Sequence, residues 1–530
     1  MIPPTKELAN VTSEAASISE NSVQTGIAIY IDDELDNNKQ QQATTTIRKP
    51  YTPPKWRKIM SYAWDSFGLE PEERRFIQRI DFFIFSYSLL SYVIKYLDQG
   101  NVSNAYVSGM KEDLNLRGQE RNLFTTFFNI GYLIGSVPSQ IIINRTRASI
   151  FIPTCELVWS ILVMCLAAAK NAKTIYGIRF IVGLAEATVF PGFALILGSW
   201  YYPDQMGKRM ALFEVSSSAA QMFSGYIQSG VYASMNGRYG IAGWRWAFII
   251  DGVISLPIAL AGYYCIPDFP TTTRALWLNE KDRKYAVERM AKIGRKPPRP
   301  LTVGRLVKFF LSPRPYVFQG PYNVGGFGSS SGYFNLWLSS TKKYSVEMVN
   351  ILPTAGNAIS IVVTYTCALL SDLTGRRGPF VFGVILIPFF CNIVLAIWNI
   401  SFKFKLAVNL LNYAGFAYQP VVISWAAEAF QDDAETRGLV VGFGNTINYA
   451  MSAWLPLVLY PTNLAPHYPL GYKISAMFYG VALLTVPMFW YYVRWEAKKN
   501  GKVFNEMGLA VDREDLLIPL GDEAGACSEK

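Results

Sequence analysis

Two ionisable side chains, Arg179 and Glu186, stand seven residues apart within one long apolar stretch of this chain. If residues 174 to 199 form a helix, this spacing is about two turns, which places both side chains on one face, roughly 10 Å apart. In a membrane span each ionisable group would cost about 2.5 to 3.5 kcal/mol, so it must be paired, reach water or have a function. A structural ion pair is one interpretation. The other is a functional pair, since a buried carboxylate can exchange a proton and an arginine cannot.

Amide side chains form a second group that could contact a ligand. The stretch 210 to 234 carries a polar residue every three or four positions, with Gln221 near its middle, and Asn445 and Asn448 are three residues apart in a later stretch. A polar stripe that faces lipid would be costly, so it should face a water-filled cavity or another helix. We therefore expect Gln221, Asn445 and Asn448 to contact a substrate, with hydrogen bonds between helices as the alternative.

Lys95 and Asp98 fall at the end of the first apolar stretch, 80 to 98. Asp98 is a candidate for proton coupling because an ionisable residue of a membrane span is costly unless it is paired or functional. An interfacial ion pair between Lys95 and Asp98, near the outer boundary of the membrane, is the alternative.

Enzymatic chemistry has no support in the sequence. We find no phosphate-binding glycine loop, no set of nucleophile, base and acid, and no cluster with metal-ligand spacing. His467 is the single histidine, which argues against a histidine-based proton relay. We expect a protein that is not an enzyme and that binds neither a metal nor a cofactor.

The elements that must position these residues are membrane-spanning helices. The chain is 51% hydrophobic and only 17% charged, which is too apolar for an ordinary soluble protein of 530 residues. A span needs about 20 apolar residues. Twelve stretches qualify: 80 to 98, 121 to 143, 149 to 169, 174 to 199, 210 to 234, 245 to 265, 315 to 339, 349 to 371, 379 to 399, 404 to 426, 437 to 459 and 472 to 494.

The long connection 266 to 314 divides these twelve spans into two groups of six. Asn144 and Asp372 are 228 positions apart, and so are Arg209 and Arg437, which indicates a duplicated six-helix unit. We therefore expect an all-α integral membrane protein. Its segments are a polar, partly disordered tail (1–75), a first half (76–265), a basic central loop (266–314), a second half (315–494) and a C-terminal tail (495–530).

Basic residues predict how the chain is oriented. Lys and Arg collect before the first span, in the central loop and after the last span, so these segments and both termini should be cytoplasmic. The net charge of +10 then reflects topology and attraction to anionic lipid, and we expect no nucleic-acid partner.

Residues 371 to 377, Ser-Asp-Leu-Thr-Gly-Arg-Arg, match the Asp-x-x-Gly-Arg-Arg loop of the major facilitator superfamily. The resemblance implies that superfamily's twelve-helix fold. Gly375 permits a tight turn, and Asp372, Arg376 and Arg377 can pair with a neighbouring helix end. These four residues are the predicted cytoplasmic gating latch, whose contacts break and re-form as the two halves rock. A plain positive-inside anchor is the alternative.

A closer resemblance is carried by Leu97-Asp-Gln-Gly-Asn-Val-Ser-Asn-Ala105 and by Arg179-Phe-Ile-Val-Gly183-Leu-Ala-Glu186. The chain is similar, over about residues 70 to 495, to the anion:cation symporter family and its fungal allantoate permease branch. That resemblance implies a plasma-membrane carrier in which Arg179 attracts an anion and Glu186 couples a proton. Many relatives have a basic residue where Gln99 stands, so a substrate with one carboxylate is favoured.

The expected function is proton-coupled uptake of a small organic monocarboxylate by alternating access, with pantothenate first. Biotin, nicotinate, allantoate and a dipeptide are alternative substrates by the same resemblance. An uncoupled facilitator and a non-transporting nutrient receptor are alternative functions. The expected partners are the substrate, protons and the lipid bilayer, and we expect the protein to act as a monomer.

Overall fold

The computed structural model describes residues 53–292, 303–430, 434–499, 503–504 and 510–511. The chain divides into two compact units, residues 1–80 and 81–530. Within its described residues, 53–80, the first unit contains two helices, α2 (Lys55–Ala63) and α3 (Pro71–Ile80), joined through a short 3₁₀ turn. Helices therefore begin well before residue 75. The partial disorder expected of the N-terminal tail (1–75) falls mostly on residues 1–52, which lie outside the described ranges.

The first-half helices of the second unit follow the expected spans closely. A π-helical turn (Asp81–Phe85) leads into the first of them, and a second π-helical turn (Tyr106–Met110) follows it. The helices are α4 (Ser86–Ala105), α5 (Lys111–Asp113), α6 (Glu120–Arg145), α7 (Ala148–Cys165), α8 (Ala172–Glu186), α9 (Val189–Trp200), α10 (Pro203–Met235) and α11 (Gly243–Cys265).

In its described residues the central connection contains the helices α12 (Glu280–Lys292) and α13 (Val303–Leu311), and the second half follows it. The second half contains α14 (Arg314–Gln319), α15 (Phe334–Ser340), α16 (Val346–Thr374), α17 (Arg377–Ile397), α18 (Phe402–Leu411), α19 (Tyr418–Ala429), α20 (Ala434–Leu459) and α21 (Gly471–Lys499). Two short strands, β1 (Val503–Phe504) and β2 (Ala510–Val511), pair antiparallel beyond α21.

Nine helices within the described ranges are long and apolar enough to cross a membrane. The other three expected spans depart from that pattern for visible reasons. Helix α10 and helix α20 carry the polar side chains noted above, and the span 315 to 339 is broken at its glycine-rich centre, between α14 and α15. The twelve-span helical fold is confirmed, and the two short strands lie outside the spans.

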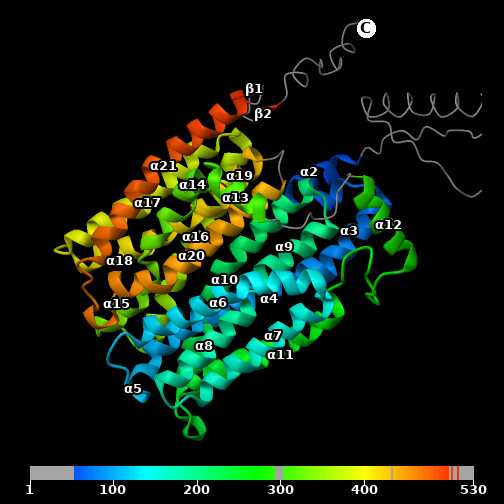
Figure 1. Ribbon diagram of the computed structural model, residues 1–530. Helices are drawn as coiled ribbons and strands as arrows, with labels where there is room; N and C mark the ends of the chain where they lie inside the picture. Colours follow the sequence, from blue (N-terminus) through cyan, green and yellow to red (C-terminus); the bar gives the residue numbers. More distant parts are fainter. Residues whose placement is uncertain (1–52, 293–302, 431–433, 500–502, 505–509, 512–530) are drawn as a thin grey trace, which may run out of the picture. The chain divides into compact units, whose positions relative to one another are not determined.

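The helices pack as two groups, which Figure 1 shows as one group coloured blue to green and another coloured green to red. In the first half α6 packs on α8, α7 on α11 and α4 on α10, whereas in the second half α17 packs on α21. The halves meet where α6 contacts α20 and α10 contacts α16. Helices from both halves can therefore line a shared site.

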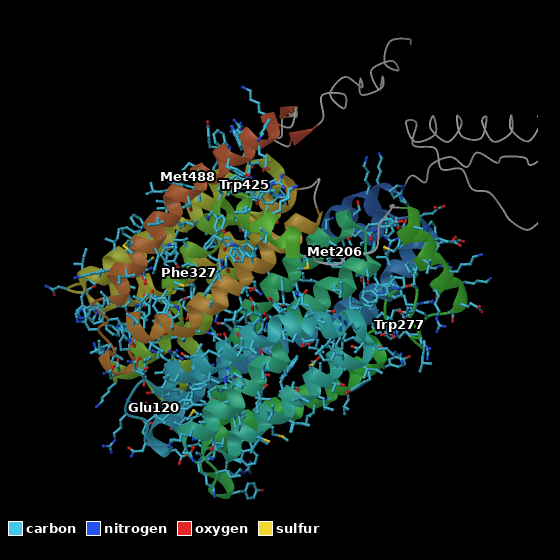
Figure 2. All side chains as sticks on the ribbon, in the orientation of Figure 1. Glu120, Met206, Trp277, Phe327, Trp425 and Met488 are labelled. Atoms are coloured by element: carbon cyan, nitrogen blue, oxygen red, sulfur yellow. The ribbon has the colours of Figure 1, made fainter. Side chains whose placement is uncertain are left out.

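The long central connection leaves and re-enters at one end of the second unit, which we call the connection end. Figure 2 marks it with Met206 and Trp277, while Glu120 lies at the opposite end. Hydrogen bonds join the two halves at the opposite end. Arg121 donates to the Gly332 carbonyl at 2.5 Å and Asn350 donates to Ser108 Oγ at 2.8 Å. The opposite end is therefore closed between the halves.

Two spans differ from expectation in ways that matter for the site. The first helix runs on to Ala105, so Asp98 lies well inside it and not at its end. The fourth span breaks into α8 and α9 directly after Glu186, which ends α8. A polar side chain at such a break sits beside backbone groups that the helix does not satisfy.

Candidate functional site

Five ionisable side chains lie buried together within the first half. They come from three helices, as Lys95 and Asp98 of α4, Arg179 and Glu186 of α8, and Asp251 of α11. Each is at most 2% exposed, so the cluster is closed to solvent in this conformation. Sequence reasoning missed Asp251, although a lone carboxylate in the apolar stretch 245 to 265 was a signal that could have found it.

Arg179 and Glu186 share a helix but form no ion pair with each other among the described residues. The Arg179 guanidinium lies 4.5 Å from the centre of the Phe128 ring, and no described residue accepts a hydrogen bond from its Nε or Nη1 atom. Glu186 Oε2 accepts a hydrogen bond from Gln99 Nε2 at 3.0 Å, while Oε1 receives none from the part of the chain that the structure describes. The structural ion pair considered for these two residues is therefore not formed.

Lys95 is surrounded by tyrosines and does not form the expected interfacial pair with Asp98. Its Nζ atom lies 3.4 Å from the Tyr132 hydroxyl and 4.7 Å from the centre of that ring. The rings of Tyr92 and Tyr96 lie at 5.8 and 5.7 Å. Aromatic faces attract a cation without neutralising it. Lys95 is thus a buried positive charge whose nearest described partners are uncharged.

The second half reaches this cluster through Tyr449 of α20. The rings of Tyr132 and Tyr449 stack with their centres 3.7 Å apart. Asn445 precedes Tyr449 by four residues and so lies on the same face of α20. Gln221, Asn445 and Asn448 are each half-buried, and none has a side-chain hydrogen bond to another described residue. The structure thus brings Asn445 toward the cluster, while the roles of all three amides stay predictions.

The two aspartates of the cluster lie within electrostatic range of each other, across the packed interface between α4 and α11. Asn101 donates to Asp251 Oδ2 at 2.6 Å, whereas no described residue donates to either Asp98 oxygen. Asp98 is also within electrostatic range of Glu186 and Arg179. The predicted proton-coupling carboxylates are therefore neighbours.

The predicted latch lies at the connection end, between α16 and α17. Arg377 forms ion pairs with Asp372 and with Glu428 of α19, the latter at 2.7 Å. Gly375 ends α16 with φ of +63°, a conformation that favours glycine. The structure brings Asp372, Gly375 and Arg377 together, whereas Arg376 is exposed. Sequence reasoning missed Glu428, the acidic partner on the neighbouring helix end.

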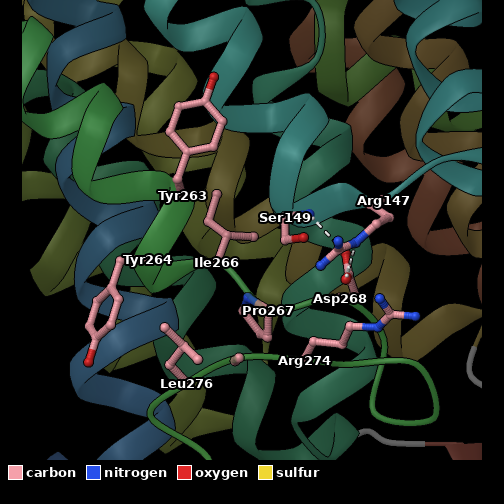
Figure 3. Close-up of a pocket in the computed structure, with 10 residues that line it drawn as sticks. Arg147, Ser149, Tyr263, Tyr264, Ile266, Pro267, Asp268, Arg274 and Leu276 are labelled. Carbon is pink, nitrogen blue, oxygen red and sulfur yellow. Dashed lines mark hydrogen bonds and ion pairs between the residues drawn. The ribbon is translucent and has the colours of Figure 1, made fainter.

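The first half uses a different acid at the corresponding place (Figure 3). Arg147 Nε lies 3.0 Å from Asp268 Oδ2, and the Ser149 amide donates to Asp268 Oδ1 at 3.0 Å. These residues border a small cavity of about 70 Å³. Asp268 follows α11 and ties the start of the central connection to the start of α7. The first-half copy of the latch therefore lacks the acid of the motif but gains one from another segment.

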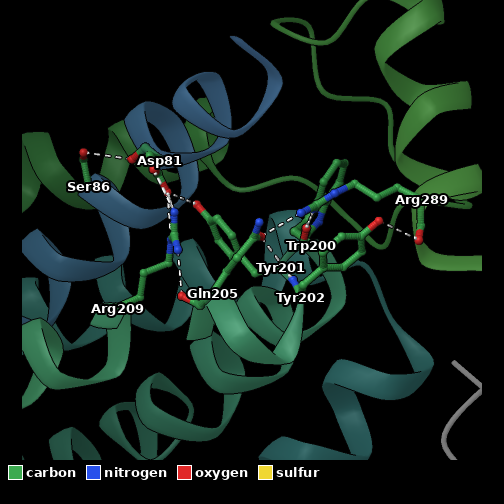
Figure 4. Close-up of polar contacts among 8 residues, drawn as sticks. All are labelled: Asp81, Ser86, Trp200, Tyr201, Tyr202, Gln205, Arg209 and Arg289. Atoms are coloured by element: carbon green, nitrogen blue, oxygen red, sulfur yellow. Dashed lines mark hydrogen bonds and ion pairs between the residues drawn. The ribbon is translucent and has the colours of Figure 1, made fainter. Parts of the chain in front are cut away.

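A second network at the connection end joins the start of α4 to α10 (Figure 4). Both carboxylate oxygens of Asp81 accept hydrogen bonds at 2.9 Å from the buried Arg209, and Tyr201 donates to Asp81 Oδ1 at 2.7 Å. Burial and the adjacent Asp81 raise the pKa of Tyr201 well above its ordinary value. Tyr201 therefore remains a neutral donor to this carboxylate.

The central connection is also anchored at this end. Arg289 of α12 donates to the Trp200 carbonyl at 3.0 Å and to Gln205 Oε1 at 2.7 Å. Its guanidinium lies 3.7 Å from the centre of the Tyr202 ring. A segment expected to be a basic loop thus docks one buried arginine onto the α9–α10 junction.

Comparison with known proteins supplies the family context. A family model described as Major Facilitator Superfamily matches residues 88–456. The MFS transporter PfmaC of Pestalotiopsis fici is 34% identical over 449 residues, which cover 83% of this chain and 85% of that protein. The pantothenate transporter liz1 of Schizosaccharomyces pombe is 32% identical over 413 residues, covering 76% and 79%. The D-xylose–proton symporter structure aligns with a TM-score of 0.57 at 17% identity, over 77% of this chain and 97% of that one.

Proposed function

This chain belongs to the Major Facilitator Superfamily, whose members are transporters and not enzymes. We propose that it takes up a small organic monocarboxylate together with protons. Pantothenate is the first candidate substrate, on the strength of the likeness to the pantothenate transporter of Schizosaccharomyces pombe. Biotin, nicotinate, allantoate or a dipeptide would be the substrate if pantothenate is not.

The observation that carries this proposal is the buried cluster of two cations and three carboxyl groups. Among the described residues, Arg179 Nε and Nη1 have no acceptor, and the one hydrogen bond that Lys95 makes is to a tyrosine hydroxyl. Unfilled cationic donors suit a substrate carboxylate, because hydrogen bonds between charged groups are the strong ones. Glu186 has one oxygen to which no described residue donates, and it can take up a proton there.

The charges of the cluster favour one monoanion that travels with one proton. Lys95 and Arg179 contribute two positive charges and Glu186 one negative charge, and Asp98 and Asp251 together contribute one negative charge when one of the two holds a proton. The cluster is then neutral. A bound monoanion would leave an uncompensated buried charge, which is strongly unfavourable. A proton on Glu186 compensates that charge, so we expect the substrate anion and the proton to bind together.

Transport requires the halves to open at one end at a time, since the cluster is closed to solvent and the opposite end is joined by Arg121 and Asn350. In this proposal the connection end faces the cytoplasm, because it carries the basic segments. The latch residues lie at the same end: Asp372, Gly375, Arg376 and Arg377. The membrane is the plasma membrane and the acting unit a single chain.

Uptake of labelled pantothenate, measured in cells that lack their own carrier, tests the proposal. We expect accumulation that a protonophore abolishes. Glu186→Gln should lose proton-driven accumulation but keep exchange of substrate across the membrane, because it binds substrate but cannot release a proton. Surface expression of both forms is the control.

The alternatives give different results in the same assay. Accumulation that persists after the proton gradient collapses would contradict proton symport. Equilibration without accumulation indicates an uncoupled facilitator, and intact growth signalling without uptake indicates a receptor. Competition by a panel of vitamins, ureides and dipeptides identifies the substrate if pantothenate is not taken up.

A further inference from the structure

A small cavity lies where the central connection leaves α11 and passes the start of α7 (Figure 3). Its volume of about 70 Å³ is far below the roughly 300 to 1,000 Å³ of pockets that hold drug-sized ligands. Three of the residues that line it are charged: Arg147, Asp268 and Arg274. Two arginines and one aspartate give the lining one net positive charge. A small anionic group is therefore the kind of ligand that fits.

The two arginines have unused hydrogen-bond donors. Arg147 donates from its Nε atom to Asp268 Oδ2 at 3.0 Å, and no described residue accepts a hydrogen bond from its two terminal nitrogens. Arg274 is exposed, and its side chain makes no hydrogen bond or ion pair with any residue that the structure describes. Guanidinium groups match the geometry of phosphate oxygens and bind them through parallel hydrogen bonds. Both side chains can therefore donate to one phosphate in this cavity.

The start of α7 contributes a buried hydroxyl to the same cavity. Ser149 is 8% exposed, and its Oγ atom has no hydrogen-bond partner among the described residues. Its backbone amide, in contrast, donates to Asp268 Oδ1 at 3.0 Å, so a carboxylate already occupies the helix start. A buried hydroxyl without a partner is costly, and its proton can turn toward an acceptor. An oxygen atom of a ligand in the cavity would satisfy this hydroxyl.

The wall that carries Arg274 is held in place by contacts to helices on both sides. Trp277 donates from its ring nitrogen to the Tyr264 carbonyl of α11 at 3.1 Å. Arg283 of α12 donates to the Ala275 carbonyl at 2.9 Å. The cavity is thus formed before any ligand enters, which reduces the entropy that is lost on binding.

The rim of the cavity is aromatic and apolar where it meets the outer surfaces of α7 and α11. Tyr263 and Tyr264 lie in the last turn of α11 and are 41% and 50% exposed, and Leu276 of the connection is 84% exposed. The same surfaces carry further exposed apolar side chains, including Ile150 and Leu260. In a chain that spans a membrane such surfaces meet lipid tails, and tyrosines are typical of the membrane boundary. A phospholipid can therefore place its phosphate in the cavity with its tails along these helices.

We propose that this cavity binds the phosphate group of an anionic phospholipid, which Arg147, Arg274 and the Ser149 hydroxyl hold. The bound lipid links the central connection to the start of α7 through that phosphate. This inference goes beyond the proposed function. It rests on the orientation given there, in which this end meets the anionic cytoplasmic leaflet, and not on the substrate or its coupling to protons.

Lipid binding to the purified full chain tests the inference without any transport. Protein in detergent is titrated with short-chain phosphatidylglycerol, and bound lipid is counted by native mass spectrometry. Phosphatidylcholine with the same tails is the second probe, and inorganic phosphate is the competitor. We expect one phosphatidylglycerol to bind saturably and phosphatidylcholine to bind about tenfold more weakly, because its headgroup carries no net charge. Inorganic phosphate should displace the lipid only at much higher concentration, because it lacks the tails.

Three substitutions assign the site to its residues. Arg274→Gln should weaken phosphatidylglycerol binding about tenfold, because it removes a charged donor, and Ser149→Ala should weaken it about threefold. Neither side chain has a hydrogen-bond partner among the described residues, so both variants should fold. Arg145→Gln is the matched control, because Arg145 is also exposed and lies two residues before Arg147 but does not line the cavity. It should bind the lipid as the wild type does.

Three results would overturn the inference. Equal loss of binding in Arg145→Gln and Arg274→Gln would indicate a diffuse basic surface instead of a site. Wild-type binding in both Arg274→Gln and Ser149→Ala would exclude the cavity as the place where the lipid binds. Displacement by an equal concentration of inorganic phosphate would contradict a lipid as the source of the phosphate. An absence of pantothenate uptake leaves these binding measurements unchanged, so a failure of the proposed function is distinguished from a failure of this site.

Discussion

At the scale of single residues, helix spacing determines which face a side chain lies on, whereas tertiary contacts determine its partners. The seven-residue spacing puts Arg179 and Glu186 on one helix face, yet the partners of each side chain come from other helices. Glu186 is held by Gln99, and Arg179 stacks on Phe128. Gln99 is thus an amide donor to the Glu186 carboxylate and adds no positive charge beside it.

Lys95 supplies the clearest prediction at this scale. Its replacement by methionine, which keeps much of the length of the side chain, removes a buried positive charge from the vicinity of Glu186. Loss of one such charge is worth at least about 1.4 kcal/mol, a factor of ten in affinity. We therefore expect the KM for a carboxylate substrate to rise about tenfold or more in uptake assays.

The exposed Lys173 of α8 provides the control for that variant. Lys173→Met removes the same charge from the same half and should leave KM unchanged. Equal KM values for wild type and Lys95→Met would show that the substrate does not use this charge.

At the scale of helices, glycine sets how closely α6 and α8 approach. A Cβ on Gly183 would lie 2.1 Å from the Phe128 carbonyl oxygen, and one on Gly131 would lie 2.1 Å from the Phe180 carbonyl oxygen. Neither backbone can give way without separating the two helices that carry Arg179 and its ring contact. Small residues at such crossings allow close packing in membranes.

Gly183→Ala should accordingly destabilise the protein by about 1 to 3 kcal/mol, the usual cost of overpacking. The matched control is Gly177→Ala on the same helix, where an added Cβ meets no atom within 4 Å. Thermal unfolding in detergent should show a lower midpoint for the first variant and an unchanged or raised one for the second. Equal midpoints would mean that α6 and α8 are not in close contact.

Tyr201 gives a pH prediction at the junction of α9 and α10. Because its pKa is raised in the folded protein, the folded state favours the neutral phenol. Its stabilising contribution is then complete below the unfolded pKa of about 10 and is lost as the pH rises above that value.

Tyr201→Phe lacks both the hydrogen bond to Asp81 and this titration. The variant should be less stable by about 1 kcal/mol near neutral pH. The difference from wild type should shrink above about pH 10, in unfolding measured from pH 7 to 11. A difference that stays constant across this range would contradict burial of the phenol.

At the scale of the whole molecule, helices of both halves enclose a buried cluster of five ionisable side chains. The cluster belongs to the first half, and the second half reaches it through Tyr449 and the opposite end through Asn335. The asymmetry is physical, since one half carries the charges and the other covers them. Rocking of the second half would then expose the cluster without rearranging the first-half helices that carry it.

Charge balance predicts how transport responds to voltage. A monoanion that moves with one proton carries no net charge, so a membrane potential should not drive it. Uptake into proteoliposomes driven by a pH gradient should be unchanged when valinomycin imposes an inside-negative potential. Each additional proton would add about 2.3 kcal/mol per 100 mV, so a clear stimulation would establish a second coupled proton.

The sequence alone was sufficient for the membrane environment, the twelve spans, the repeat and the family, because hydrophobic length and spaced motifs are local properties of the chain. It also selected Arg179, Glu186, Asp98 and the residues around Arg377 as candidates, whose roles stay predictions. Only the tertiary structure decided which of them meet. Asp251, Glu428 and Asn335 lie far along the chain from their partners, and no local pattern pairs them. The structure also changed where Lys95 and Asp98 are placed. The first helix extends further than hydropathy indicates, so both side chains are buried in the interior of the first half and not at the membrane boundary.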